Sequence, residues 1–137
     1  MNQMIVSVWD KMLRRISGVN HFVTHNKDYE IQFQNLLAPF PNYATMQDNI
    51  RFYIANNVAA IFCQGNREKG GEFAELRGYL LAKLLWNPDC DVQKEMDDFI
   101  MGYYGKGGVY IKQYINEMEQ ALAESGKLLS MDGEPEE

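Results

Sequence analysis

The sequence predicts an α/β fold in which helices dominate, and three observations lead to this expectation. Residues 58–62 form a continuous apolar run of strand length. After a glycine-rich loop, residues 72–87 show an apolar stripe at helical spacing, which Pro88 ends because it cannot donate to the helix ladder. Strand, loop and helix in this order form one half of a βαβ unit, in which ligands bind at the carboxyl ends of the strands. The length of 137 residues is typical of one domain.

Four elements are predicted before this central unit. Apolar positions at helical spacing predict a helix over residues 5–16. Residues 19–24 are rich in β-forming side chains and predict a strand, and alternation over residues 29–33 favours another extended piece. Residues 45–57 then follow the helical period, with Thr45 as the expected N-cap.

Two further helices are predicted after Pro88. Asp91 is the expected N-cap of a helix over residues 91–103, and a final helix covers residues 109–128. The glycines between these helices favour helix ends over a phosphate loop, because no strand precedes them and the P-loop spacing is incomplete. The acidic residues 129–137 are expected to be disordered, so the predicted division is a single domain over 1–128 and a tail over 129–137.

Composition limits the classes of function. The net charge of −6 argues against nucleic acid and against an anionic membrane surface as partners, since both need a basic face. No signal peptide or membrane span is visible, so a cytoplasmic location is the default unless the chain is a piece of an exported protein. His21 and His25 lack the glutamate of a zinc motif, and Cys63 and Cys90 form no metal or disulfide pattern. The sequence therefore predicts no metal and no cofactor.

Four stretches together resemble a bacterial family described as domain of unknown function 4838. They are LAPFPNYATMQDNIRFY (37–53), NNVAAIFCQGN (56–66), GGEFAELRGYLLAKLLWNPD (70–89) and FIMGYYGKGGVYIKQYI (99–115). That family looks like the barrel region of glycoside hydrolases. The resemblance implies a helix-rich partial (β/α) barrel fragment, from the C-terminal part of a barrel, with about five helices and two or three short strands. The chain is too short for a whole barrel of about 250 residues.

The resemblance also implies a sugar pocket. Asp28 and Tyr29 stand where the family tends to show Trp-Asp-Tyr at a strand end, and Gln64 and Glu72 would complete the substrate-binding set. Each has a structural alternative: a turn cap for Asp28, a place in the core for Tyr29, hydrogen bonds to loop backbone for Gln64, and the start of the helix for Glu72. Cys63 stands where a glutamate is usual, and a thiol cannot replace a carboxylic acid as proton donor to a glycosidic oxygen.

Three hypotheses about function follow. The first is a segment of a glycoside-hydrolase-like barrel that binds carbohydrate without hydrolysing it alone, since hydrolysis usually needs two carboxyl groups. The second is a helical interaction module without ligand chemistry, whose partner is a second copy of the chain or the missing barrel segment. Its contact residues would be the tyrosines with Trp9, Trp86, Met96 and Met101. The third, least supported, is an enzyme that pairs Cys63 with His21 or His25.

Overall fold

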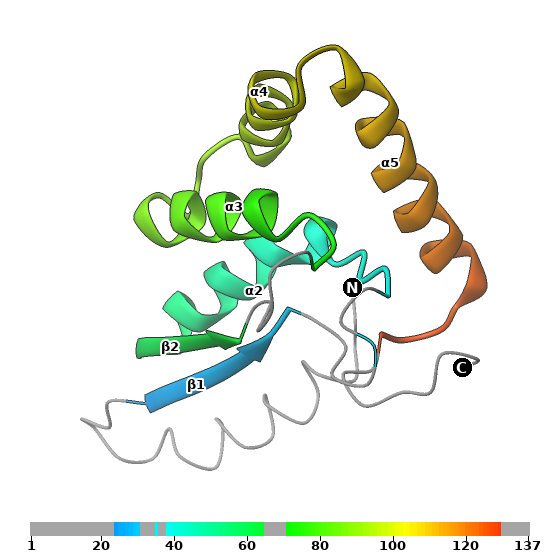
Figure 1. Cartoon of the computed structure of the whole chain (residues 1–137). Helices are drawn as coiled ribbons and strands as arrows, with labels where there is room; N and C mark the ends of the chain where they lie inside the picture. Colours follow the sequence, from blue (N-terminus) through cyan, green and yellow to red (C-terminus); the bar gives the residue numbers. More distant parts are fainter. Residues whose placement is uncertain (1–23, 31–34, 36–37, 65–70, 130–137) are drawn as a thin grey trace.

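The computed structural model of the chain describes residues 24–30, 35, 38–64 and 71–129. Its elements in chain order are β1 (Thr24–Tyr29), α2 (Tyr43–Ala55), β2 (Val58–Gln64), α3 (Ala74–Trp86), α4 (Val92–Tyr104), the 3-10 turn η1 (Gly105–Gly107) and α5 (Gly108–Ser125). Figure 1 shows α2 lying on the strands, α3 beyond α2, and α4 beyond α3. From the end of α4, α5 runs back along the side of this stack (Figure 1).

The two described strands form a parallel sheet. Tyr29 and Gln64 are backbone partners at its carboxyl end, and Asp28 is the partner of Cys63. The register is irregular between Thr24 and His25. A parallel pair needs a crossover connection, and α2, which contacts β2, occupies that connection.

The predicted fold class is wrong: the described part of the chain is a helix-rich domain, not a fragment of a (β/α) barrel. In a barrel each helix leads to the next parallel strand and packs on the sheet. Here α3, α4 and α5 follow one another with no strand between them. They pack in sequence, α3 on α2 and α4, and α5 on α4. The sheet stays at two strands within the described residues.

Most individual elements lie close to their predicted positions. The strand predicted over 58–62 is confirmed as β2, and the helices predicted after it are confirmed as α3, α4 and α5. Of the strand predicted over 19–24, only Thr24 lies within the described residues, and it is the first described residue of β1. The prediction of Thr45 as N-cap is wrong: the cap is Asn42, and the Thr45 hydroxyl donates to the Asn42 carbonyl oxygen. The helix predicted over 5–16, the tail after 129 and most of the extended piece over 29–33 lie outside the described residues.

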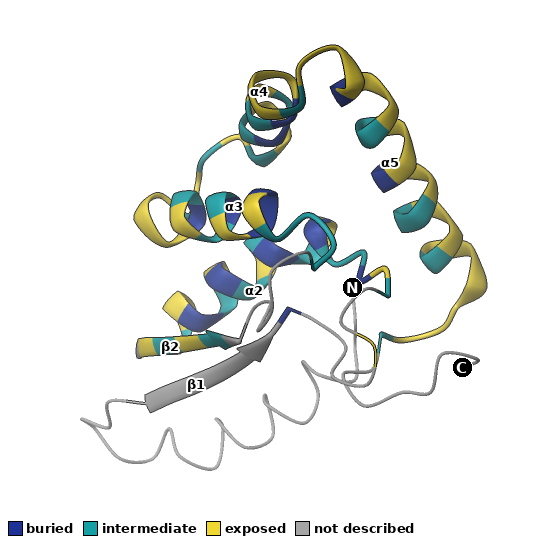
Figure 2. Ribbon diagram, in the orientation of Figure 1, coloured by how far each residue is buried: buried dark blue, intermediate teal, exposed yellow. Residues whose placement is uncertain are grey.

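The core lies between the helices. Leu76, Leu80 and Leu84 repeat every four residues on α3 and are fully buried. They pack with residues of the neighbouring helices, namely Met46, Ile50 and Tyr53 on α2, Met96 and Ile100 on α4, and Ile115 on α5. Figure 2 shows the buried residues on the facing sides of α2, α3 and α4, whereas α5 is mostly exposed. Helix α3 therefore covers helices rather than a sheet, which leaves Leu85 and Trp86 54% and 91% exposed.

The crossing of α4 and α5 depends on Gly108. A Cβ atom at this residue would lie 2.8 Å from the backbone oxygen of Ile100 and 3.0 Å from its Cγ2. Only glycine lets the two helices approach this closely without a shift. The chain reaches this contact through Gly105, whose φ of +57° lies in the left-handed region that glycine adopts readily.

Candidate functional site

The structure brings three of the four predicted substrate-binding residues together by their backbones. Asp28, Tyr29 and Gln64 lie at the carboxyl end of the sheet, with Tyr29 directly opposite Gln64. The described side chains do not include these three, so their contact with sugar stays a prediction. Glu72 lies just before α3. Its Oε2 accepts a hydrogen bond from the Phe40 amide at 3.1 Å, and its Oε1 accepts one from the Tyr114 hydroxyl at 2.8 Å.

A buried polar network links this end of the sheet to α3. Glu30 directly follows β1 and is 1% exposed, and Arg77 on α3 is 2% exposed. Arg77 Nη1 lies 3.9 Å from Glu30 Oε2, and Asn42 accepts from Arg77 while donating to Glu30. Arg77 Nη2 also donates to the Phe40 carbonyl oxygen at 3.2 Å. This network is sealed from solvent, so its carboxylate holds the fold together rather than meeting a ligand.

Tyr43 completes this network. Its hydroxyl accepts a hydrogen bond from Arg77 Nη2 at 3.3 Å, and the guanidinium carbon lies 4.7 Å from the centre of its ring. Burial raises the pKa of the Tyr43 phenol, against the opposing effect of the Arg77 charge. Arg77 Nε is buried without a hydrogen-bond partner. The guanidinium therefore donates several hydrogen bonds, but one of its N–H groups is buried without an acceptor.

Two carboxylates fasten α5 to the rest of the domain. Glu72 accepts from Tyr114, and Glu119 on α5 accepts a hydrogen bond from the Ala44 amide at 2.8 Å. The Ala44 amide belongs to the first turn of α2, which has no acidic residue of its own and no side-chain cap. Burial raises the pKa of Glu119, and the hydrogen bond from Ala44 opposes that rise. Helix α5 thus supplies the anion that the start of α2 lacks.

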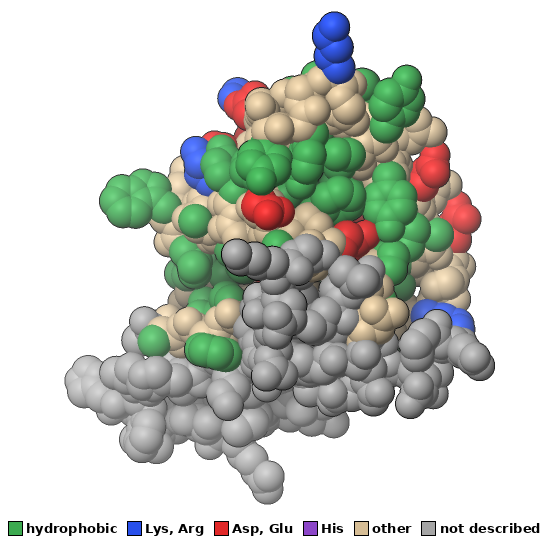
Figure 3. Space-filling model, in the orientation of Figure 1, with side chains coloured by type: hydrophobic (Ala, Val, Ile, Leu, Met, Phe, Trp, Pro, Cys, Tyr) green, Lys and Arg blue, Asp and Glu red, His purple; other side chains and the backbone are tan. Residues whose placement is uncertain are grey.

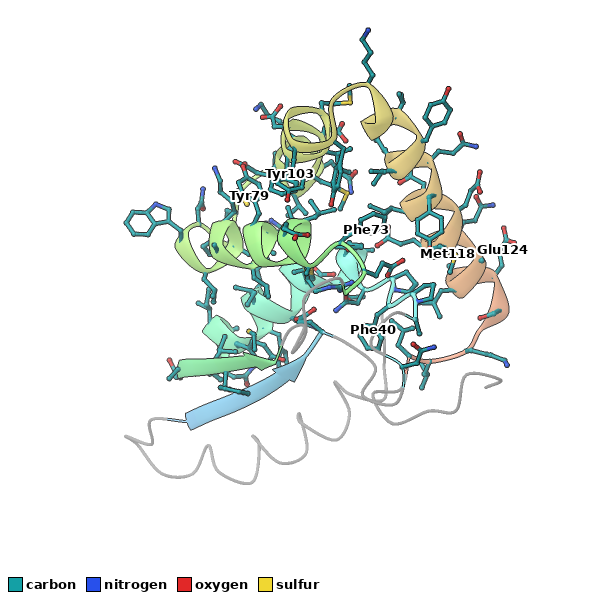
Figure 4. All side chains as sticks on the ribbon, viewed as in Figure 1. Phe40, Phe73, Tyr79, Tyr103, Met118 and Glu124 are labelled. Carbon is teal, nitrogen blue, oxygen red and sulfur yellow. The ribbon has the colours of Figure 1, made fainter. Side chains whose placement is uncertain are left out.

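Six aromatic side chains form a continuous surface over α3, α4 and α5, which we call the aromatic strip: Tyr79, Phe99, Tyr103, Tyr104, Phe73 and Tyr114. Phe99 stacks on Tyr103 with ring centres 5.1 Å apart and lies 4.8 Å from Tyr79. Edge contacts continue the strip from Tyr103 to Tyr104, Phe73 and Tyr114, with ring centres 4.9, 6.1 and 5.8 Å apart. Figure 4 shows Tyr79 beside Tyr103, with Phe73 between α3 and α5.

The strip is open to solvent and acidic. Tyr103 is 59% exposed and Tyr114 is 38% exposed, while the other four rings are half-buried. Figure 3 shows hydrophobic side chains, in green, gathered on this face with acidic side chains, in red, among them. At the end of the strip near Phe73, Glu72 is hydrogen-bonded to Tyr114, and the charge of Glu75 acts on Tyr104. At the other end, Glu95 is hydrogen-bonded to Tyr79. Aromatic rings combined with a few polar groups are typical of ligand sites.

The Tyr79 end of the strip holds a cluster of three polar groups. The Tyr79 hydroxyl donates to Glu95 Oε2 at 2.7 Å, and Lys83 Nζ lies 3.1 Å from the same oxygen. These hydrogen bonds, first from Tyr79 and then from Lys83, lower the pKa of Glu95. The bond to Glu95 in turn raises the pKa of both Tyr79 and Lys83. At the other end, burial and the hydrogen bond to Glu72 raise the pKa of Tyr114 to about 12.

Other kinds of site have less support. A hollow of about 250 Å³ lies between residues 43–51 and residues 90–93, below the usual size of a small-molecule pocket of about 300–1,000 Å³. Within the described residues, no three His, Cys, Asp or Glu side chains gather as metal ligands. None of the described helices combines the length and hydrophobicity needed to cross a bilayer. His21 lies outside the described residues, and the side chain of His25 is not described, so a thiol–imidazole pair with Cys63 is not tested.

Sequence reasoning missed both the buried network and the aromatic strip. Arg77 follows Leu76 and lies four residues after Phe73, so the helical spacing alone places it close to the buried face. No comparable pattern in the sequence indicated that Glu30 and Asn42 would join Arg77 in a buried network. The strip joins rings from residue 73 to residue 114, and only the packing of three helices brings them together. The interaction surface was predicted from the tyrosines and from four other side chains. Of these four, Met96 is 2% exposed and lies in the core, Met101 and Trp86 are exposed, and Trp9 lies outside the described residues.

The fold and this face define a small helix-rich domain with an aromatic, acidic surface. Residues 9–116 match the model of the family described as Domain of unknown function (DUF4838), and the chain belongs to that family. Searches of the curated proteins and of the solved structures find no match. The family assignment covers the sheet, α2, α3, α4 and the first half of α5, including every residue of the aromatic strip.

Proposed function

We propose that this chain is a carbohydrate-binding domain that does not hydrolyse glycosides by itself, and that the aromatic strip is its binding face. The observation that carries the proposal is the unbroken ring contact from Tyr79 to Tyr114 on an exposed face. Sugar rings present a face of C–H groups that packs on aromatic rings, while their hydroxyls seek hydrogen-bond acceptors. The strip offers both, since carboxylates lie among its rings. The resemblance of the family to glycoside hydrolases supports sugar as the ligand class.

The state of the carboxylates supports binding without hydrolysis. A glycoside hydrolase usually needs one carboxyl group as proton donor and a second as nucleophile or base. Both oxygens of Glu72 accept hydrogen bonds, and Glu95 is held by Tyr79 and Lys83. Among the described carboxylates of the strip, Glu75 alone has no hydrogen-bond or ion-pair partner. These fixed positions of Glu72 and Glu95 support binding of a sugar more than its hydrolysis.

The test is titration of the purified chain with soluble oligosaccharides, followed by calorimetry and by the NMR signals of the strip. The panel contains neutral hexose, N-acetylated, amine-bearing and uronate oligomers. Tyr103→Ala removes the most exposed ring of the strip and should weaken binding about tenfold, the equivalent of about 1.4 kcal/mol of lost stacking. Tyr110→Ala is the matched control, because Tyr110 on α5 is 76% exposed and makes no ring contact with described residues.

Three results would contradict the proposal. The first is failure of every oligosaccharide to bind at millimolar concentration. The second is an equal loss of affinity in Tyr103→Ala and Tyr110→Ala, which would place the sugar elsewhere. The third is release of new reducing ends by the chain alone, which would refute the absence of hydrolysis.

The second candidate is a homodimer, and the exposure of Trp86 favours it. Trp86 and Leu85 end α3 and are 91% and 54% exposed, an unusual position for two large apolar side chains in a monomer. A dimer through this end would show as a concentration-dependent mass in light scattering after size exclusion. Trp86→Ala should then give the monomer mass at all concentrations. A monomer mass for the unaltered chain throughout would remove this candidate.

A further inference from the structure

The aromatic strip carries more negative than positive charge. Three carboxylates belong to it: Glu72, Glu75 and Glu95. Among the described residues, the one cation that lies over a ring of the strip is Lys83. An anionic sugar would therefore meet repulsion along most of the strip, and a cationic one attraction.

The side chain of Lys83 is an example of an ammonium group bound on the aromatic strip. Its Nζ lies 5.2 Å from the centre of the Tyr79 ring and 3.1 Å from Glu95 Oε2. An alkylammonium is thus held between the face of a tyrosine and a carboxylate, the geometry of a cation–π contact reinforced by an ion pair. This arrangement uses one ring and one acid of the strip.

The opposite end of the strip has the same kinds of side chain, rings and carboxylates, and among the described residues no cation lies over its rings. Phe73 contacts Tyr104 and Tyr114, with ring centres 6.1 and 5.8 Å apart. Glu72 accepts from the Tyr114 hydroxyl, and neither Glu72 nor Glu75 has an ion-pair partner among the described residues. Burial and then the negative charge of Glu75 raise the pKa of Tyr104, so Glu75 lies within electrostatic reach of these rings.

We propose that the Phe73–Tyr104–Tyr114 end of the strip binds the protonated amine of an amino sugar, so that the ligand class is an oligosaccharide with free amines. This inference rests on the proposed carbohydrate-binding function and narrows it. The rings stabilise the ammonium through their faces, and Glu72 and Glu75 through their charge. A uronate, whose carboxylate would face the same two acids, should bind more weakly because of like-charge repulsion.

The test compares three oligomers of equal length at low and high salt: glucosamine oligomers, their N-acetylated forms, and uronate oligomers. The amine form should bind about tenfold tighter than the N-acetylated form at low salt, the combined effect of an exposed ion pair and a cation–π contact. Added salt should reduce this preference, since it screens exposed charges. In Glu75→Gln the preference for the amine form over the N-acetylated form should shrink severalfold.

Glu124→Gln is the matched control, because it makes the same change of net charge on the C-terminal half of α5, where Glu124 accepts from Gln120. An equal loss of preference in both variants would mean that net charge alone attracts the amine, and would overturn the inference. Equal affinity for the amine and N-acetylated oligomers, or tighter binding of the uronate, would overturn it while leaving the carbohydrate-binding function in place. Failure of all three oligomers to bind would refute both.

Discussion

Replacing Arg77 with methionine tests whether the buried network determines the stability of the domain. Methionine keeps most of the side-chain length and removes the charge. Arg77 is 2% exposed and Glu30 is 1% exposed, so the substitution leaves a carboxylate that solvent cannot reach. It also removes the donors to the Phe40 carbonyl, the Tyr43 hydroxyl and Asn42. We expect the free energy of unfolding to fall by about 3–5 kcal/mol, the usual effect of breaking a buried ion pair from one side.

The assay is urea denaturation followed by circular dichroism at the helical signal. The fluorescence of Trp86 is a poor reporter of unfolding, because this side chain is already 91% exposed in the folded chain. Since a domain of this size is stable by about 5–15 kcal/mol, the expected loss is a large part of the total. Arg51→Met is the matched control: Arg51 pairs with Asp89 at 2.9 Å, but its side chain is 47% exposed, and such a pair contributes about 0–1 kcal/mol.

A double-mutant cycle isolates the ion pair. Combining Glu30→Gln with Arg77→Met removes both charges, so the loss should be smaller than the sum of the two single losses by about 0.5–3 kcal/mol. The reasoning fails if Arg77→Met costs no more than Arg51→Met, or if the two single losses simply add.

Two further predictions concern α5. Gly108→Ala should destabilise the domain by about 1–3 kcal/mol, because its Cβ would lie 2.8 Å from the Ile100 oxygen. Gly107→Ala is the control and should leave the stability unchanged, since no atom lies within 4 Å of its Cβ. Similar unfolding midpoints for the two variants would contradict the close crossing of α4 and α5. The pKa of Tyr114 is raised from 10.0 to about 12, so the folded chain holds this proton more tightly than the unfolded chain, and the stabilisation is complete below pH 10 and lost as the pH rises towards about 12. Tyr114→Phe should lose stability relative to the unaltered chain, and the difference should narrow over that pH range; a difference that does not change with pH would refute the assignment.

Local patterns in the sequence predicted the elements but not their arrangement. The four-residue spacing of Leu76, Leu80 and Leu84 predicts α3 and its buried face, because helix geometry alone puts these side chains in one row. The same spacing cannot say what the row packs against. A helix that covers a sheet would also bury Leu85 and Trp86, and their exposure reflects the choice of α2 and α4 as neighbours. Tertiary contacts decide which elements α3 packs against, and the spacing of its residues does not reveal them. The prediction of a barrel fragment was wrong for this reason.

The candidate site was predictable only in part, for the same reason. Asp28, Tyr29 and Gln64 end two strands whose parallel pairing follows from a crossover helix, so their meeting could be expected. The aromatic strip, by contrast, depends on the angle at which α5 leaves α4. That angle depends on the close approach of Gly108 to Ile100, which no periodicity in the sequence encodes.

Helix α2 lies between the paired strands β1 and β2 in the chain, and this order bears on how the domain folds. Helices α3, α4 and α5 touch their neighbours in the chain, so their loops close over short distances. The pairing of β1 with β2 must close a loop that contains the whole of α2, so we expect it to form late. In hydrogen exchange we therefore expect the amides of β1 to lose protection before those of α3, with the helical layer surviving as the last cooperative unit.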